Sequence, residues 1–317
     1  MRKIEEDSES NFDFRELALI CIFLTVIILV FTMRTHSIWR ISLLTAFALV
    51  AFASNSVLNR LALGGNTIDA GSYIGIRIAS GAFMLWLLNG YLKHNFKLKL
   101  THNFIPAFYL VLYGVAFSFA YISLSSGTGA FILFGTVQAT MLSTALVNGE
   151  KPFWVEWVGL FVALGGLIYL VFPGMSAPDP LGAVLMVIAG VAWGLYSLKG
   201  RGVKDPLEAT AQNFMLAVPM VFVVNLFAFS TSHLSSEGVL YACLSGALTS
   251  GVGYAVWYAA LKGLTNMQAA LLQLCVPIIA AFGGVIFLSE QITTRLIYAG
   301  LFIIGGVVVA LLGKRST

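Results

Sequence analysis

The sequence has 317 residues, of which 59% are hydrophobic and only 10% are charged, and its net charge is +4. A soluble globular domain carries about 25% charged residues, so this chain lacks the polar surface that such a domain needs. Residues 100–149, 209–236, 238–261 and 263–289 contain no Asp, Glu, Lys or Arg, and each run exceeds the roughly 20 apolar residues that cross a bilayer. The composition therefore excludes a soluble enzyme, a secreted disulfide scaffold and a disordered chain, and it indicates a polytopic membrane protein.

The first 38 residues combine an acidic tail with an apolar stretch at 17–33. A helix of that length reaches about 25 Å, which crosses a bilayer only if the bilayer thins slightly. A cleaved signal peptide is not expected, because acidic residues precede the stretch and no A-x-A site follows it. We interpret the stretch as an additional membrane-spanning helix. A helix lying in the interface and an over-long start of the chain are the alternatives.

The rest of the chain alternates between apolar segments and short connections rich in turn-forming residues. We predict an all-α polytopic fold of ten transmembrane helices, with the additional N-terminal helix before them. No connection is long enough to fold as a separate domain. The ten spans cover approximately residues 39–63, 70–92, 104–124, 128–148, 154–173, 180–198, 208–230, 237–260, 266–288 and 294–313.

Basic residues gather at alternate boundaries between the spans. Twelve Lys and Arg residues lie at one set of boundaries, and only Arg60 and Arg295 lie at the other. Cytoplasmic loops carry an excess of Lys and Arg, so the richer set is expected in the cytoplasm, together with the C-terminus. The basic residues sit singly in short loops and form no patch that would indicate nucleic acid binding.

The chain matches itself at a shift of 140 residues. Glu150 aligns with Glu290, and Gly165-Gly166 aligns with Gly305-Gly306. Each repeat holds five spans, an odd number, so the second copy enters the membrane from the opposite side. Inverted repeats of this kind are typical of carriers that hold one site at the midplane between two halves. We therefore predict three parts: an N-terminal tail and extra helix (1–38), a first repeat (39–173) and a second repeat (174–317).

Several motifs resemble a known family. They are Tyr258-Ala-Ala-Leu-Lys262 through Ala269-Ala270, Pro277 and Leu288-Ser289-Glu290 to Gly305-Gly306, the counterpart from Phe131 through Gly149-Glu150 to Gly165-Gly166, Trp193-Gly194-Leu195-Tyr196, and Arg77. Together they resemble the EamA-type branch of the drug/metabolite transporter superfamily, over about residues 39–313. The resemblance implies ten helices in two inverted repeats around a central cavity. It also implies export or exchange of small metabolites, amino acids among them, across the bacterial inner membrane.

Arg77 is the one clear ionisable residue inside a span. Such a group costs at least about 2.5–3.5 kcal/mol at mid-span, so it needs a reason to be there. One interpretation is a cation that faces the cavity and binds a substrate carboxylate. The other is an arginine that fixes helix packing by hydrogen bonding to carbonyls or by reaching toward the membrane surface.

Uncharged amide and aromatic side chains supply the rest of the candidate binding surface. An amide that faced lipid would lack hydrogen-bond partners, so these side chains are expected to point inward. Interhelical hydrogen bonds and core packing are the alternative roles. The predicted substrate-binding residues are Asn55, Asn59, Arg77, Gln138, Trp193, Tyr196, Tyr254, Trp257, Tyr258 and Gln273.

No Asp or Glu lies in the middle third of any predicted span. Carriers driven by protons or sodium commonly use such a carboxylate, so its absence favours facilitated export or exchange. The sequence contains no hydrolase, zinc-protease or nucleotide-binding motif, and we expect no catalytic residue, metal or cofactor.

These observations predict a secondary transporter that moves a small amphipathic metabolite, an amino acid or a related compound, by alternating access, in efflux or exchange. The expected partners are that substrate and membrane lipid, and no partner protein is implied. Uptake of a sugar, a nucleoside or a cationic drug is the alternative within the same class. A membrane-embedded enzyme or a lipid scramblase is the alternative from a different class.

Overall fold

The structure is a computed structural model that describes residues 38–94, 96, 103–124, 126–149, 153–171, 179–228, 233–288 and 294–312. Contacts divide the chain into two units, Met1–Arg40 and Ile41–Thr317. The second unit holds both predicted repeats except residues 39 and 40, and their division at residues 173 and 174 stays a prediction. The apolar stretch 17–33 and the aligned Glu150 and Glu290 lie outside the described residues.

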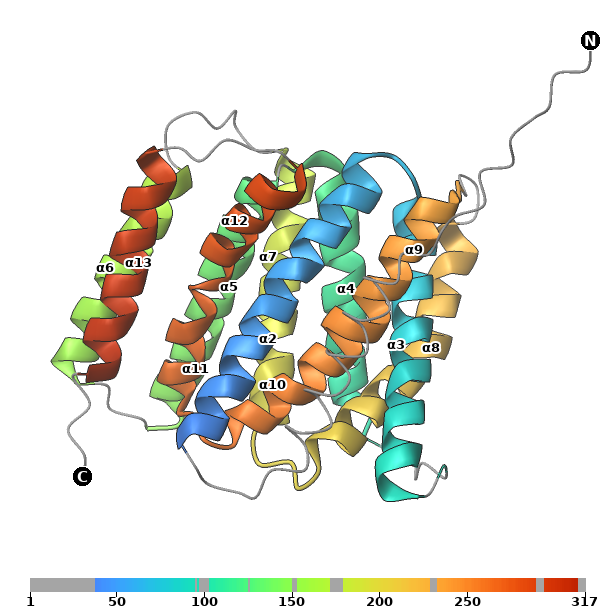
Figure 1. The fold of residues 1–317 in the computed structure, drawn as a ribbon, viewed down its shortest axis with the longest axis horizontal. Helices are drawn as coiled ribbons and strands as arrows, with labels where there is room; N and C mark the ends of the chain where they lie inside the picture. Colours follow the sequence, from blue (N-terminus) through green and yellow to red (C-terminus); the bar gives the residue numbers. More distant parts are fainter. Residues whose placement is uncertain are drawn as a thin grey trace, which may run out of the picture. The chain divides into compact units, whose positions relative to one another are not determined.

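Ten helical segments occur in the described part of the chain, and each agrees with a predicted span to within two residues at either end. Seven of them are long and apolar enough to cross a membrane by length and composition. The prediction of a polytopic all-α membrane protein is therefore confirmed. In chain order the segments are α2 with η1 (Ile38–Asn59, Arg60–Gly64), α3 (Ala70–Lys93), α4 (Ile105–Ser123), α5 (Ser126–Val147), α6 (Trp154–Val171), α7 (Pro180–Gly200), α8 (Pro206–Ala228), α9 with η3 and α10 (Ser236–Leu244, Ser245–Val252, Gly253–Leu261), α11 with α12 (Asn266–Gln273, Val276–Leu288), and α13 (Thr294–Leu312) (Figure 1).

Acidic side chains mark the beginnings of the helices. The Asp69 carboxylate accepts a hydrogen bond from the backbone N–H of Ser72 at the start of α3, and Asp179 does the same for Gly182 at the start of α7. Negative charge is favourable there because helix N-termini carry unpaired N–H groups and partial positive charge. The acidic residues that the structure describes all occupy such helix beginnings and are Asp69, Glu156, Asp179, Asp205, Glu208 and Glu237.

Near the end of α3, one ion cluster joins two of these carboxylates to a lysine. The Lys93 ammonium lies 2.7 Å from Asp205 and also contacts Glu208. Partial burial by itself would raise the pKa of Asp205, but the backbone N–H of Glu208 and the Lys93 ammonium outweigh it and hold the pKa below its ordinary value. The cluster ties the end of α3 to the start of α8 and keeps these charges away from the middle of the helices.

The ninth span breaks where the sequence contains a proline. α11 ends at Gln273, a short turn follows, and α12 begins at Val276 with Pro277 in its first turn. Proline lacks a backbone N–H and clashes with the preceding turn of a helix, but it is tolerated at a helix beginning. The break lies next to Gln273, which is one of the predicted site residues.

Helix pairing follows the predicted relation between the two repeats. In each of the pairs α6–α13, α3–α8 and α5–α11, the two helices that pack together occupy equivalent places in the two repeats. The pair α6 and α13 lies side by side at one edge of Figure 1. In addition, α4 packs on α8 as its counterpart η3 packs on α3. Contacts between the two predicted repeats therefore extend from the α6–α13 pair at the edge to the α3–α8 pair (Figure 1).

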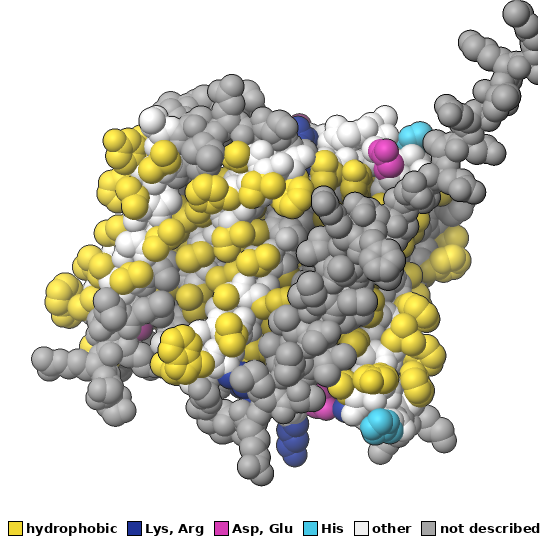
Figure 2. Space-filling view, in the orientation of Figure 1, with side chains coloured by type: hydrophobic (Ala, Val, Ile, Leu, Met, Phe, Trp, Pro, Cys, Tyr) yellow, Lys and Arg dark blue, Asp and Glu magenta, His cyan; other side chains and the backbone are white. Residues whose placement is uncertain are grey.

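Large apolar side chains cover the outer faces of these helices. Phe161, Phe222, Ile286, Phe287 and Leu301 are each more than 60% exposed. On the face drawn in Figure 2, hydrophobic side chains cover the middle of the helices, and the visible charged ones lie near the ends. Water would penalise such a surface, whereas lipid tails do not. This pattern is the one expected of a membrane-embedded protein.

Two glycines bring α7 against α5. A Cβ atom added at Gly190 would lie 2.6 Å from the Thr136 Cβ and 2.8 Å from the Leu133 carbonyl oxygen, and one at Gly194 would lie 3.0 Å from Thr140. Small residues are what allow helices to approach this closely in a membrane. The α5–α7 contact therefore depends on the absence of a side chain at Gly190.

Replacing Gly190 with alanine should destabilise the protein, because the added methyl group must push α7 away from α5. We expect a cost of about 1–3 kcal/mol, visible as a lower midpoint of thermal unfolding in detergent. Gly165→Ala is the matched control, since no atom lies within 4 Å of a Cβ at Gly165. Equal midpoints for the two variants would contradict the close contact.

Candidate substrate-binding site

α3 carries Arg77 into the middle of the bundle, where its side chain is 1% exposed. The carboxylates of the described residues all lie at helix ends, so none of them pairs with the guanidinium. Charged groups that are buried without a partner of opposite charge are rare, because leaving water costs several kcal/mol. The neutral groups around Arg77 therefore decide how it is held.

Two hydroxyl groups hold one side of the guanidinium. Nε donates to the Ser250 hydroxyl at 2.9 Å, and Nη2 donates to the Tyr254 hydroxyl at 2.6 Å. The central carbon lies 5.6 Å from the ring centroid of Tyr113 and 5.8 Å from that of Phe117, within the range of cation–π attraction. Nη1 is buried and has no hydrogen-bond partner among the residues that the structure describes. The guanidinium is thus hydrogen-bonded through Nε and Nη2, while the described residues offer no acceptor to Nη1.

A π-helix positions the hydroxyl groups. η3 interrupts the eighth span over Ser245–Val252, and π-helical turns within α-helices are frequent at functional sites. Gly246 within it lies against α3 so closely that an added Cβ would collide with the Arg77 carbonyl oxygen. This close approach brings Ser250 within reach of the Arg77 side chain.

A hydrogen-bond network extends from Arg77 into the first repeat. The amide of Asn55 on α2 donates to the Tyr254 hydroxyl at 3.3 Å and accepts a hydrogen bond from Ser245. The Tyr254 hydroxyl in turn lies 3.5 Å from that of Tyr113 on α4. Groups from α2, α3, α4, η3 and α10 therefore meet at one point between the repeats.

Aromatic rings pack beside this network. The Trp193 ring centroid lies 4.6 Å from that of Tyr254 and 5.6 Å from that of Tyr196. It also lies 5.0 Å from the centroids of Phe52 and Tyr113. Aromatic pairs at these separations contribute about 0.5–1.5 kcal/mol each beyond the burial of their area. The rings come from α2, α4, α7 and α10, so this aromatic cluster also joins the repeats.

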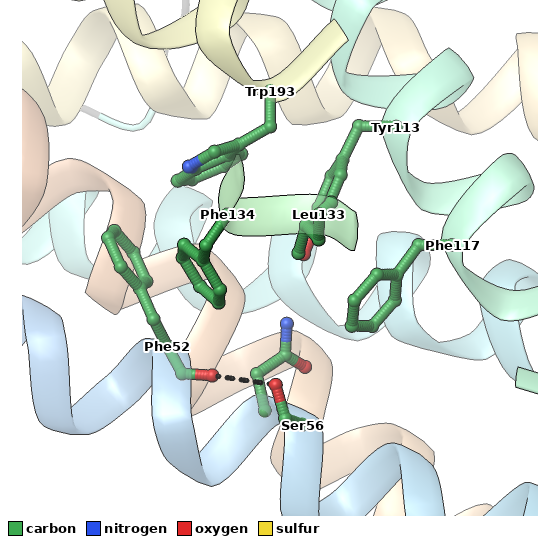
Figure 3. A pocket seen from close by; sticks show the side chains of 8 residues that line it. Phe52, Ser56, Tyr113, Phe117, Leu133, Phe134 and Trp193 are labelled. Carbon is green, nitrogen blue, oxygen red and sulfur yellow. Dashed lines mark hydrogen bonds between the residues drawn. The ribbon is translucent and has the colours of Figure 1, made fainter. Parts of the chain in front are cut away.

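A small cavity lies between these side chains, with a volume of about 10 Å³. Figure 3 shows its lining, in which the side chains of Phe52 and Ser56 from α2 face Tyr113, Phe117 and Trp193. The space is about one water molecule in size, so the cavity is closed in this conformation. The residues that line it are Phe52, Asn55, Ser56, Tyr113, Phe117, Leu133, Phe134 and Trp193.

Three further predicted residues form hydrogen bonds with α7. The Trp193 indole donates to the Gln273 side-chain oxygen at 2.7 Å, which links α7 to α11. Trp257 donates to the Ser197 hydroxyl at 3.1 Å, and Tyr258 donates to the backbone carbonyl of Tyr196 at 3.0 Å. These bonds tie α10 to α7 and satisfy the polar atoms of the large rings.

Two predicted residues, Asn59 and Gln138, are buried without hydrogen-bond partners. Asn59 is fully buried and lies one helical turn beyond Asn55 on α2, while Gln138 lies one turn beyond Phe134 on α5. None of their amide atoms has a partner among the described residues. A buried amide without partners is costly, so both sites suit a water molecule or a polar ligand.

Of the ten predicted site residues, the structure brings seven into the connected network and aromatic cluster, and those seven are Asn55, Arg77, Trp193, Tyr196, Tyr254, Tyr258 and Gln273. Trp257 joins their edge, since its ring lies 5.6 Å from that of Phe52. Only Asn55 and Trp193 line the closed cavity directly. That these residues bind substrate stays a prediction.

Sequence reasoning missed several residues that the structure places at this point. Tyr113 and Phe117 are one turn apart on α4, and that aromatic spacing was a usable signal. Ser245 and Ser250 lie in a segment rich in serine and glycine, which is unusual inside an apolar span. Nothing in the sequence distinguishes Phe52 from other phenylalanines that pack in the core.

Two larger openings lie outside the closed cavity. A groove of about 340 Å³ runs between residues 50–61 of the first span and 279–287 of α12, and its lining is almost entirely apolar. A vestibule of about 540 Å³ lies at one end of α5 and α7. The residues that line the vestibule are Thr144, Asn148, Leu195, Leu198, Lys199, Arg201, Gly202 and Asn266.

Comparison with known proteins identifies relatives of the chain. The model of the EamA-like transporter family matches residues 180–312. The protein PA1977 of Pseudomonas aeruginosa is 45% identical over 272 residues, which cover 86% of this chain and 94% of that protein. The threonine/homoserine exporter RhtA of Salmonella typhimurium is 30% identical over 156 residues, which cover 48% of this chain and 52% of that protein.

A solved crystal structure shares the fold. It aligns with a TM-score of 0.70 and covers 85% of this chain and 99% of its own, at 16% sequence identity. The agreement concerns the arrangement of the helices alone.

Replacing Tyr254 with phenylalanine should destabilise the protein, because it removes the hydroxyl that accepts hydrogen bonds from Arg77 and Asn55. Hydrogen bonds to charged groups contribute about 1.5–3 kcal/mol, so we expect a clear fall in the thermal unfolding midpoint. Tyr298→Phe is the control, since that ring is 55% exposed on α13. If both variants unfold at the wild-type temperature, the buried network does not stabilise the fold.

Proposed function

The chain belongs to the EamA-like transporter family, and on that premise we propose that it moves a small amphipathic metabolite across the membrane by alternating access. The observation that carries the proposal is the closed cavity between the repeats. α2, α4, α5 and α7 contribute its walls, so a shift between the halves changes its size. A cavity at such an interface is where inverted-repeat carriers hold their substrates.

The cavity walls favour an amphipathic compound. Phe52, Phe117, Phe134 and Trp193 offer apolar rings, while Asn55 offers an amide. Mostly apolar pockets with a few placed polar groups suit small metabolites that have both characters. An amino acid or a related compound meets this description, and the name of the relative RhtA supports the same class and export as the direction.

The distribution of acidic residues along the helices favours exchange or facilitated export. No acidic residue that the structure describes lies in the middle of a helix, so these residues offer no carboxylate for a proton or sodium ion. The family and the bias of basic residues support placement in the bacterial inner membrane with the C-terminus in the cytoplasm. In that orientation the vestibule beside Lys199 opens to the cytoplasm.

Uptake of a sugar, a nucleoside or a cationic drug is the second candidate. A cationic drug is disfavoured by the buried positive charge of Arg77, which would repel it. An embedded enzyme or a scramblase draws no support from relatives named as transporters.

Counterflow in liposomes tests the proposal. Liposomes that contain the purified protein and unlabelled L-threonine or L-homoserine should accumulate the labelled compound faster than liposomes without protein. Trp193→Phe should slow this uptake about fivefold, because it removes the hydrogen bond from the Trp193 indole to Gln273. That factor corresponds to the usual contribution of one hydrogen bond. Trp154→Phe is the control, because Trp154 is 74% exposed.

Two outcomes would contradict the proposal. One is the absence of counterflow with a panel of amino acids, sugars and nucleosides. The other is chemical conversion of a compound, or lipid flip-flop, without saturable transport.

A further inference from the structure

We propose that Arg77 is an anion-binding subsite of the carrier and that the transported compounds carry a single carboxylate. This inference rests on the proposed transport function and adds the chemical class of the substrate. It follows from the charge, the unused hydrogen-bond donors and the position of Arg77.

The first argument is the missing counter-charge. Arg77 is 1% exposed, and no described carboxylate lies near it. The groups that it contacts, Ser250, Tyr254 and the rings of Tyr113 and Phe117, are all neutral. A buried cation that has only neutral neighbours is a site where an anion is strongly favoured.

The second argument is the set of donors that remain free. A guanidinium has five N–H groups, of which Nε and Nη2 use one each on Ser250 and Tyr254. Nη1 is buried and has no partner in the described part of the chain. The end of the guanidinium that carries Nη1 is therefore where a ligand can accept hydrogen bonds, with Nη2 beside Nη1 on the same edge. That pair matches the two oxygens of a carboxylate.

The third argument is position. The rings of Tyr113 and Phe117 contact the guanidinium and also line the closed cavity. Arg77 thus lies one side chain away from the space that the substrate must enter. A cavity of about 10 Å³ has to widen before it holds any metabolite, and widening at Tyr113 or Phe117 gives the ligand access to the guanidinium.

The charge of the site selects among anions. One guanidinium compensates one negative charge, and Arg77 is the cation that contacts Ser250, Tyr254 and the rings of Tyr113 and Phe117. A phosphate dianion would keep an uncompensated charge in a dry site, whereas a monocarboxylate would not.

A matched set of ligands tests the subsite. The probes are 4-methylpentanoate, 4-methylpentanamide and 4-methylpentylamine, which differ only in the polar end. Titrations of the purified protein follow its tryptophan fluorescence, because Trp193 and Trp257 lie beside the network. We expect the carboxylate to bind at least about tenfold more tightly than the amide, and the amine to bind more weakly than either.

Arg77→Gln should reduce the preference for the carboxylate over the amide to less than about twofold, since the fixed charge is gone. Arg60→Gln makes the same change at the end of the first span and should leave the preference intact. If Arg77→Gln fails to fold, Arg77→Lys keeps the charge but loses the planar fork, and it should retain a reduced preference. Equal binding of carboxylate and amide by the wild-type protein overturns the subsite.

Counterflow of the same three compounds separates this inference from the proposed function. Transport that favours the carboxylate supports both. Equal transport of the three compounds supports a carrier but refutes the anion subsite. Tight binding of the carboxylate without counterflow of any of the three supports the subsite and refutes transport of this class.

Discussion

The structure depends on one electrostatic constraint, a guanidinium buried among apolar helices with no carboxylate beside it in the described part of the chain. Neutral groups must offset the cost of removing this charge from water, and two hydroxyls and two aromatic rings supply part of that stabilisation. These groups come from α4, η3 and α10, and Asn55 on α2 binds the same tyrosine hydroxyl. Hydrogen bonding to Arg77 therefore joins elements of both predicted repeats at one point. Its Nη1 donor has no acceptor among the described residues, and a ligand can supply one.

Packing differs between two equivalent places in the repeats. α7 lies directly against α5, where Gly190 and Gly194 leave no room for a side chain. The counterpart of α7 is α2, and between α2 and α12 there is an apolar groove of about 340 Å³ instead. In the predicted division into two repeats, equivalent helix pairs thus form one close contact and one open groove.

The sequence was informative where one physical signal dominates. Apolar length and turn formers located the ten helical segments, and the break in the ninth lies beside Pro277. Arg77 was recognisable because a charge inside a span is costly. The partners Ser245, Ser250 and Tyr113 were not, since serine and tyrosine are common in ordinary helix contacts. Their convergence depends on the π-helix η3, whose extra residue per turn has no distinct signature in composition. The sequence also could not predict that α7 packs closely on α5 while α2 and α12 leave a groove, because this depends on the rotation of whole helices.

Access to Ser56 tests the central claim most directly. This small residue lines the closed cavity between the repeats, and a cysteine fits there in a background without Cys21, Cys243 and Cys275. A thiol reagent that does not cross membranes would be added to right-side-out and to inside-out vesicles. The account predicts that Ser56→Cys reacts from either face and that a transported carboxylate slows both reactions. Reaction from one face only would show that the cavity does not open alternately and would contradict the account.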